Sequence, residues 1–141
     1  MTRKYIGTKI VTAYPQEKDG KPGYGVIYAD GYTSWSPKEV FEESYRAIER
    51  DGQELNFGDA LHMLKLGKKV TRAGWNGSGM FAYLVPAASY RAQTGVANAH
   101  FGDSAMVPYR AYIALKTAQG DVATWAPSCS DALAEDWQVV E

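Results

Sequence analysis

Residues 55–85 read LNFGDALHMLKLGKKVTRAGWNGSGMFAYLV, and this stretch decides the fold because it predicts a helix, a turn and two strands in succession. Asn56 is a suitable helix N-cap, Asp59 follows three residues later, and Gly67 is a natural C-terminal stop. Apolar residues recur between these ends at helical spacing. The buried face of the predicted helix is formed by Phe57, Ala60, Leu61 and Leu64.

The second half of the stretch predicts two strands that a glycine-rich turn connects. Lys68–Arg72 and Met80–Val85 have strand composition. The turn between them, Gly74–Gly79, contains Asn76-Gly77, which can supply the left-handed backbone of a tight turn. A helix followed by an antiparallel strand pair indicates an α+β domain.

The remainder of this domain, which we place at residues 55–141, adds further strands. Pro86–Pro108 is rich in Ala, Ser, Gly and Asn, and we expect a long connection, of a length that is usually functional or mobile. Ala111–Lys116 and Val122–Trp125 predict a hairpin, and Trp137–Val140 predicts a terminal strand. With a short helical turn capped by Ser130, they predict a small antiparallel sheet with packed helices.

Residues 1–50 predict a separate, small module that consists of a β-hairpin and a helix. Strand composition at Lys9–Tyr14 and Tyr24–Tyr28 is followed by Asp30-Gly31, a strong hairpin signal. Ser36-Pro37-Lys38-Glu39 contains the residue types of a helix-starting capping box. Three residues share one face of this helix, namely Phe41, Tyr45 and Ile48. We expect a linker at Glu49–Glu54.

Composition excludes several classes of protein. The 141 residues suffice for one domain with an appendage, and the single cysteine cannot form an internal disulfide, which favours a reducing compartment. The sequence has no apolar run long enough to span a membrane and no signal-peptide pattern, so we expect a soluble, cytosolic protein without a membrane partner. With 15 basic and 16 acidic side chains, the chain is not suited to binding a nucleic acid polymer.

The near-neutral net charge conceals a segregation. Between Ala60 and Gly120 the chain has seven basic residues and one acidic residue, a net charge of +6, and the remaining residues carry −7. Such asymmetry is explained by an anionic ligand, or by acid-to-base contact between parts of the chain or between subunits. Two separately solvated surfaces would explain it equally well.

Catalytic and metal-binding signals are weak. The two histidines, His62 and His100, and the one thiol, Cys129, match no zinc-binding spacing. We therefore predict no metal, no cofactor and no catalytic residue. The alternative is a nucleotide-degrading enzyme in which His100, Asp103 or Asp131 acts as acid or base.

Ligand-binding signals are stronger. In the Gly74–Gly79 turn, Trp75 can serve as a stacking platform and Asn76 as a hydrogen-bonding group, although a hairpin turn with a packing tryptophan is the simpler interpretation. Trp125 offers a second platform, and Arg72 just before the turn can contact phosphate oxygens. Two aromatic platforms and cationic groups suit a purine with phosphates. On chemistry alone we add Tyr109 and Arg110.

An ordered series of motifs resembles a known family. The series consists of Phe57-Gly58-Asp59-Ala60-Leu61, Gly67-Lys68-Lys69-Val70, Gly74-Trp75-Asn76-Gly77-Ser78-Gly79-Met80, Lys116-Thr117-Ala118, Trp125, Ser128-Cys129-Ser130-Asp131 and Leu133-Ala134-Glu135-Asp136-Trp137. It resembles the second described type of Thoeris anti-defence protein of phages and prophages. The resemblance implies a non-enzymatic sponge that holds a cyclic ADP-ribose-type immune signal, and in some members cyclic dinucleotides, without cleaving it. It also implies a homo-oligomer, typically a tetramer, with ligand sites between subunits.

The resemblance also implies site residues and a location. Trp75, Asn76 and Trp125 would belong to the ligand pocket, and Ser128 and Asp131 would supply polar contacts. The protein would act in the cytoplasm of the infected bacterial host. Residues 1–50 lie outside the resemblance, and Tyr24–Tyr45 within them resembles an N-terminal module of many phage proteins. A further alternative is a phage structural or interaction module in which the aromatic residues make subunit contacts only.

Overall fold

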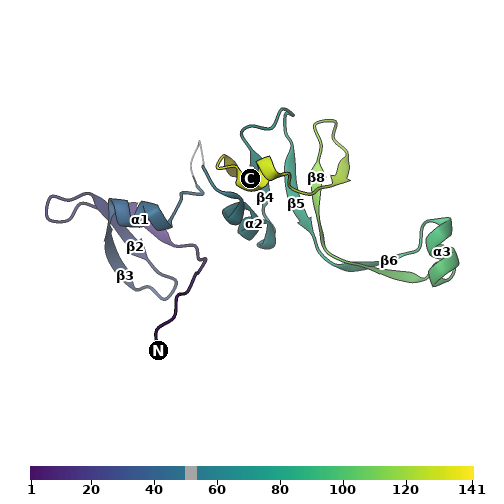
Figure 1. The fold of residues 1–141 in the computed structure, drawn as a ribbon, viewed down its shortest axis with the longest axis horizontal. Coiled ribbons are helices and arrows are strands. Elements are labelled where there is room, and N and C mark those ends of the chain that lie inside the picture. Colours follow the sequence, from purple (N-terminus) through teal and green to yellow (C-terminus); the bar gives the residue numbers. More distant parts are fainter. Residues whose placement is uncertain (50–53) are drawn as a thin grey trace. The chain divides into compact units, whose positions relative to one another are not determined.

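The computed structural model describes residues 1–49 and 54–141. The chain forms two compact units, Met1–Arg46 and Ala47–Glu141, which are drawn in Figure 1 and described separately below. Most of the linker expected at Glu49–Glu54 lies outside the described residues. None of the described helices is both long and apolar enough to cross a bilayer.

The first unit is a three-stranded antiparallel sheet with one helix. Its strands β1 (Thr12–Pro15), β2 (Gly23–Ile27) and β3 (Thr33–Pro37) lie in the order β1-β2-β3, and α1 (Lys38–Ser44) packs on β2 and β3. The predicted hairpin at Asp30-Gly31 joins β2 to β3. Gly31 in this turn has a φ of +87°, which glycine adopts without strain.

The capping box predicted for α1 is wrong. Ser36 pairs with Tyr24 within the sheet, so its backbone is extended, and the N-cap is Pro37 without a side-chain cap. The helix ends at Ser44, before Ile48. Aromatic stacking holds the helix to the sheet, since Phe41 stacks on Tyr24 with ring centroids 4.3 Å apart.

The second unit is built on a five-stranded antiparallel sheet in the order β10-β4-β5-β8-β9, with α2 packed against the sheet and α4 packed against α2. Its elements are α2 (Phe57–Lys65), β4 (Lys69–Arg72), β5 (Phe81–Val85), β8 (Tyr112–Lys116), β9 (Val122–Thr124), α4 (Cys129–Leu133) and β10 (Trp137–Val140). The predicted α+β class, with a small antiparallel sheet and packed helices, is confirmed.

Helix α2 begins and ends as predicted. Asn56 accepts a hydrogen bond from the Asp59 amide, and Asp59 accepts one from the Asn56 amide, which is a complete capping box. Gly67 follows the helix with a φ of +84°. The helix covers a core whose buried members are Leu55, Ala60, Met63, Leu64, Val70, Ala82 and Trp137.

The long connection predicted at Pro86–Pro108 is wrong. This segment forms β6 (Ala88–Arg91), α3 (Gly95–Phe101) and β7 (Met106–Tyr109), and the β6–β7 ribbon extends away from the sheet with α3 at its tip (Figure 1). The ribbon continues β5 and β8 in the same register, since Val85 pairs with Tyr112 and Ala88 pairs with Tyr109. Pro86, which has no amide donor, lies where the strands are interrupted.

Candidate functional site

Four aromatic side chains meet at one end of the core. The ring centroid of Trp75 lies 5.9 Å from that of Trp125 and 5.4 Å from that of Trp137, and both contacts are edge to face. Phe57, at the start of α2, lies 5.5 Å from Trp137. Trp137 is fully buried, as predicted, whereas Trp75 and Trp125 are half-buried. The two tryptophans assigned to a ligand thus belong to one aromatic cluster.

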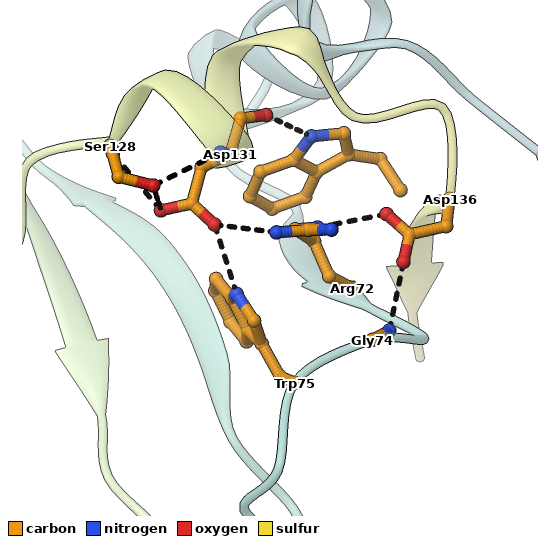
Figure 2. Close-up of polar contacts among 7 residues, drawn as sticks. Arg72, Gly74, Trp75, Ser128, Asp131 and Asp136 are labelled. Carbon is orange, nitrogen blue, oxygen red and sulfur yellow. Dashed lines mark hydrogen bonds and ion pairs between the residues drawn. The ribbon is translucent and has the colours of Figure 1, made fainter.

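Arg72, the last residue of β4, lies between two carboxylates (Figure 2). Its Nε donates to Asp136 Oδ1 at 2.8 Å, and its Nη1 donates to Asp131 Oδ1 at 2.9 Å. The Arg72 side chain is 18% exposed, so both ion pairs are largely shielded from water. Charge-assisted hydrogen bonds of this kind are strong. The guanidinium that the sequence assigned to a phosphate is therefore already bound within the chain.

Asp131 connects this ion pair to α4 and to Trp75. Its Oδ2 accepts hydrogen bonds from the Ser128 amide at 3.0 Å and the Ser128 hydroxyl at 2.9 Å, and Ser128 Oγ accepts one from the Asp131 amide. The helix therefore begins after Ser128, and the predicted cap at Ser130 is wrong because Asp131 has capping-box spacing from Ser128. The other oxygen, Oδ1, also accepts a hydrogen bond from Trp75 Nε1 at 3.2 Å (Figure 2).

These contacts fix the charge states. Burial opposes ionisation of Asp131, but hydrogen bonds from Ser128, Arg72 and Trp75 outweigh burial and lower the pKa of the Asp131 carboxyl to about 2. Arg72 lowers the pKa of Asp136 against the opposing effect of burial, and Asp136 and then Asp131 raise the pKa of Arg72. At neutral pH the cluster is thus one cation held by two anions.

The glycine turn is tied down at both ends. The Gly74 amide donates to Asp136 Oδ2 at 2.8 Å. Lys116 Nζ, at the end of β8, donates to the Gly79 carbonyl at 3.2 Å, which places a cation beside the turn. The left-handed residue of the turn is Gly79, with a φ of +71°, and not the predicted Asn76-Gly77.

Gly77 is required for another reason, close packing. A Cβ at this position would lie 2.2 Å from Met80 Sδ and 2.9 Å from Ala118 Cβ, so any larger residue would displace the turn from its neighbours. Asn76, directly before it, is exposed. The turn therefore presents an amide side chain to solvent from a backbone that is packed and hydrogen-bonded.

The predicted ligand residues fall into two groups. Those at the aromatic cluster and the ion pairs are Arg72, Trp75, Asn76, Trp125, Ser128 and Asp131. Tyr109 and Arg110 instead lie where the ribbon leaves the sheet, and Tyr109 packs against Tyr90 with ring centroids 5.9 Å apart. Among the described residues, these two side chains are not joined to the Arg72 network.

The residues of the enzyme alternative are also apart. His100 lies on α3, packed edge to face on Phe101, and Asp103 follows α3 at the tip of the ribbon. Asp131 lies in the network against the core. Within residues 1–49 and 54–141, no group of three or more His, Cys, Asp or Glu side chains is arranged to hold a metal ion.

The charge segregation has a structural explanation in part. Arg72 belongs to the basic stretch, and both of its partners belong to the acidic C-terminal segment. Acid-to-base contact between parts of the chain, one of the expected explanations, is therefore present. Two further cations of the basic stretch, Lys116 and Arg110, lie outside these ion pairs.

Sequence reasoning missed Asp136 and Lys116. Asp136 lies 64 residues from Arg72, and the two meet because β10 pairs with β4, with Trp137 opposite Arg72. The available signal was a carboxylate directly before the terminal strand. Lys116 was part of a quoted motif, but its proximity to Gly79 depends on the pairing of β5 with β8, in which Phe81 lies opposite Lys116.

Comparison with known proteins identifies a family for the second unit. Residues 55–140 match the family described as the Thoeris anti-defense 2-like domain. The chain is also 39% identical over 88 residues to a protein of Bacillus phage SP01 named Thoeris anti-defense 2, and the match covers 62% of this chain and 96% of that protein. The family match includes the aromatic cluster, the ion pairs and the ribbon, and it supports an anti-defence role. The chain therefore belongs to the Thoeris anti-defense 2-like family of phage proteins.

Proposed function

We propose that this protein binds a cyclic nucleotide immune signal and sequesters it without cleaving it. The signal would be of the cyclic ADP-ribose type, with cyclic dinucleotides as further ligands, and binding would take place in the cytoplasm of the infected host. The observation that carries the proposal is the turn with Trp75 and Asn76, fixed at the edge of an aromatic cluster in a Thoeris anti-defense 2-like domain.

In this proposal Trp75 and Trp125 cover the purine and do not enclose it between them. Their rings are 68° apart in orientation and 5.9 Å apart in centroid distance. A base sandwiched between two rings needs parallel planes about 7 Å apart, which is two contact distances of about 3.5 Å. A base stacked on the exposed part of the cluster, with Asn76 bonding to its edge, agrees better with this geometry.

The phosphates require cations. Arg72 has Nε and Nη1 on carboxylates, so in this proposal it contributes to the local potential and contacts phosphate through its remaining amino group. Lys116, beside the turn, is the better placed cation. Ser128 and Asp131 use their side chains for the helix cap and the network, which favours a supporting role for both.

Tyr109 and Arg110 find a role if sites form between subunits. Tyr109 ends β7 and Arg110 directly follows it, so in this proposal they contact ligand that is bound to a neighbouring copy. The ribbon and the start of β8 expose large apolar side chains, namely Tyr90, Val96, Phe101, Met106, Tyr109 and Tyr112. Exposed apolar surface of this kind is typical of subunit contacts, which supports the proposed homo-oligomer. The tetramer within this proposal rests on the family resemblance alone.

Sequestration needs no chemistry. If the free signal falls below the dissociation constant of the host effector, defence fails by mass action. High affinity and abundance then matter, and turnover does not. The separation of His100 and Asp103 from Asp131 agrees with a non-enzymatic inhibitor.

One experiment tests the proposal against its alternatives. The purified protein is incubated with cyclic ADP-ribose isomers and with cyclic dinucleotides, separated from free nucleotide, and heated, and the released material is analysed. Intact nucleotide is expected. A cleaved product would indicate the nucleotide-degrading enzyme, and no uptake of any nucleotide would favour a structural or interaction module.

The variant Trp75→Ala tests the site directly. We expect its affinity to fall by at least about 1 kcal/mol, the contribution of one stacked base, while the assembled mass is unchanged. Titration calorimetry below the unfolding temperature measures the affinity, and Tyr32→Ala, an exposed aromatic residue of the first unit, is the control. Equal affinities for the two variants would remove Trp75 from the site.

A further inference from the structure

Asp136 contacts the ligand turn although it was not among the predicted ligand residues. We propose that Asp136 is a positioning residue that holds Trp75 and Asn76 in their binding geometry, an inference that rests on the proposed function. It lies between α4 and β10, so it is fixed by elements that are distant in sequence from the turn.

The carboxylate of Asp136 joins the turn to the sheet. Oδ1 accepts a hydrogen bond from Arg72 Nε at 2.8 Å, and Oδ2 accepts one from the Gly74 amide at 2.8 Å (Figure 2). The Asp136 carbonyl also accepts a hydrogen bond from the Ala73 amide at 3.2 Å. Asp136 therefore binds the two residues that directly precede Trp75.

The contacts close into a ring. From Asp136 the path runs through Gly74 to Trp75, from the Trp75 indole to Asp131 Oδ1, and from there through Arg72 back to Asp136. Both ends of Trp75 are thus held, the backbone by way of Asp136 and the indole by Asp131. The orientation of the ring relative to the turn is fixed by this closed set of bonds.

A carboxylate is required for this role because both of its oxygens accept hydrogen bonds. In the same orientation an asparagine would place its oxygen toward one donor and its donating NH₂ group toward the other, so it cannot reproduce the bonds to both Arg72 and Gly74. The Asp136 side chain is 33% exposed, against 13% for Asp131, so water can replace its bonds at moderate cost. Loss of Asp136 should therefore release the turn more than it destabilises the fold.

The test compares Asp136→Asn with Glu135→Gln, an exposed neighbouring acid that loses the same charge. Two-dimensional amide NMR follows the Gly74 amide and the Trp75 indole N–H, titration measures affinity for cyclic ADP-ribose isomers, and thermal unfolding measures stability. For Asp136→Asn we expect shifted Gly74 and Trp75 signals and at least a fivefold loss of affinity. Glu135→Gln should match the unchanged protein in all three measurements.

The outcomes separate this inference from the proposed function. If the unchanged protein binds no nucleotide, the proposed function fails, and the NMR signals still decide whether Asp136 positions the turn. If Asp136→Asn leaves the Gly74 and Trp75 signals in place, the inference is overturned. It is also overturned if affinity falls only as far as unfolding explains, because Asp136 would then be a purely structural residue.

Discussion

The two ends of the β5–β8 strand pair are built in opposite ways. At the end near the glycine turn, charged side chains are largely shielded from water and paired with one another, as Arg72 is with Asp131 and Asp136. At the other end the same pair of strands continues into the β6–β7 ribbon (Figure 1), where exposed apolar side chains include Tyr90 on β6 and Val96 on α3, which is 82% exposed. Stability and preorganisation belong to the first end, and the second is suited to contact with another molecule.

The difference lies in how many partners a single residue has at each end. At the end near the glycine turn, Asp131 contacts several partners, so a single substitution of Asp131 would disturb a helix cap, an ion pair and the Trp75 indole together. On the ribbon the buried side chains are small in number and size, namely Ala92 and Val107. A two-stranded ribbon of this kind is marginally stable alone in water, which favours a partner that covers it.

The largest effect should follow from Asp131→Ala. The substitution removes the cap partner of Ser128 and leaves Arg72 and the Trp75 indole without their shared acceptor, so we expect a loss of about 3–5 kcal/mol in unfolding free energy. Urea denaturation measures it. Glu135→Ala is the matched control, with an expected change within about 0.5 kcal/mol. Equal stability of the two variants would contradict the stabilising role of the end near the glycine turn.

Acid should weaken the same end by a smaller amount. The pKa of Asp131 is about 2 in the folded state, below its value of about 3.9 in an unfolded chain. The stabilisation is therefore present above about pH 4 and is lost as the pH falls toward 2, by about 2 kcal/mol. Urea midpoints at pH 6 and pH 3 measure about 1 kcal/mol of this loss, and the change should be smaller in Asp131→Asn. An equal loss in the unchanged protein and in Asp131→Asn would show that the acid sensitivity does not come from Asp131.

The smallest effect on stability should come from the ribbon. The double substitution Val96→Ser with Phe101→Ser changes exposed side chains, so the unfolding free energy should change by less than about 0.5 kcal/mol. We expect the assembled mass to fall in light scattering, because the apolar contact is lost. Val122→Ser, an exposed apolar residue of β9, serves as the control. A variant that keeps its full mass would show that assembly does not use the ribbon.

Local signals predicted most of the second unit. The helix with its Asn56 cap and Gly67 stop, the strands on both sides of the glycine turn and the terminal strand with buried Trp137 all depend on residues close in sequence. The ribbon did not follow from such signals. Its strands are short, contain Pro108 and carry little alternation, and their pairing continues a register that is set elsewhere in the sheet.

The site was predictable to a lesser degree. The motif identified Trp75 and Asn76, but the bonds of Arg72 required knowledge of which strands pair, because its partners lie about sixty residues away. Ser128 and Ser130 both had capping chemistry. Ser128 stands three residues before Asp131, which is the spacing of a capping box, whereas Ser130 stands directly before it. This spacing matters because Asp131 lies against the core.

Because β5–β8 and β6–β7 share one register, the length of the ribbon strands sets the distance of α3 from the sheet. Each residue added to both strands would move α3 outward by about 3.3 Å and turn every following side chain to the opposite face. Pairs of residues added to each strand would restore the original faces at twice that displacement. Insertions of this kind would change the reach of the tip in fixed steps, while the aromatic cluster and the ion pairs at the far end of the same strands would stay as they are.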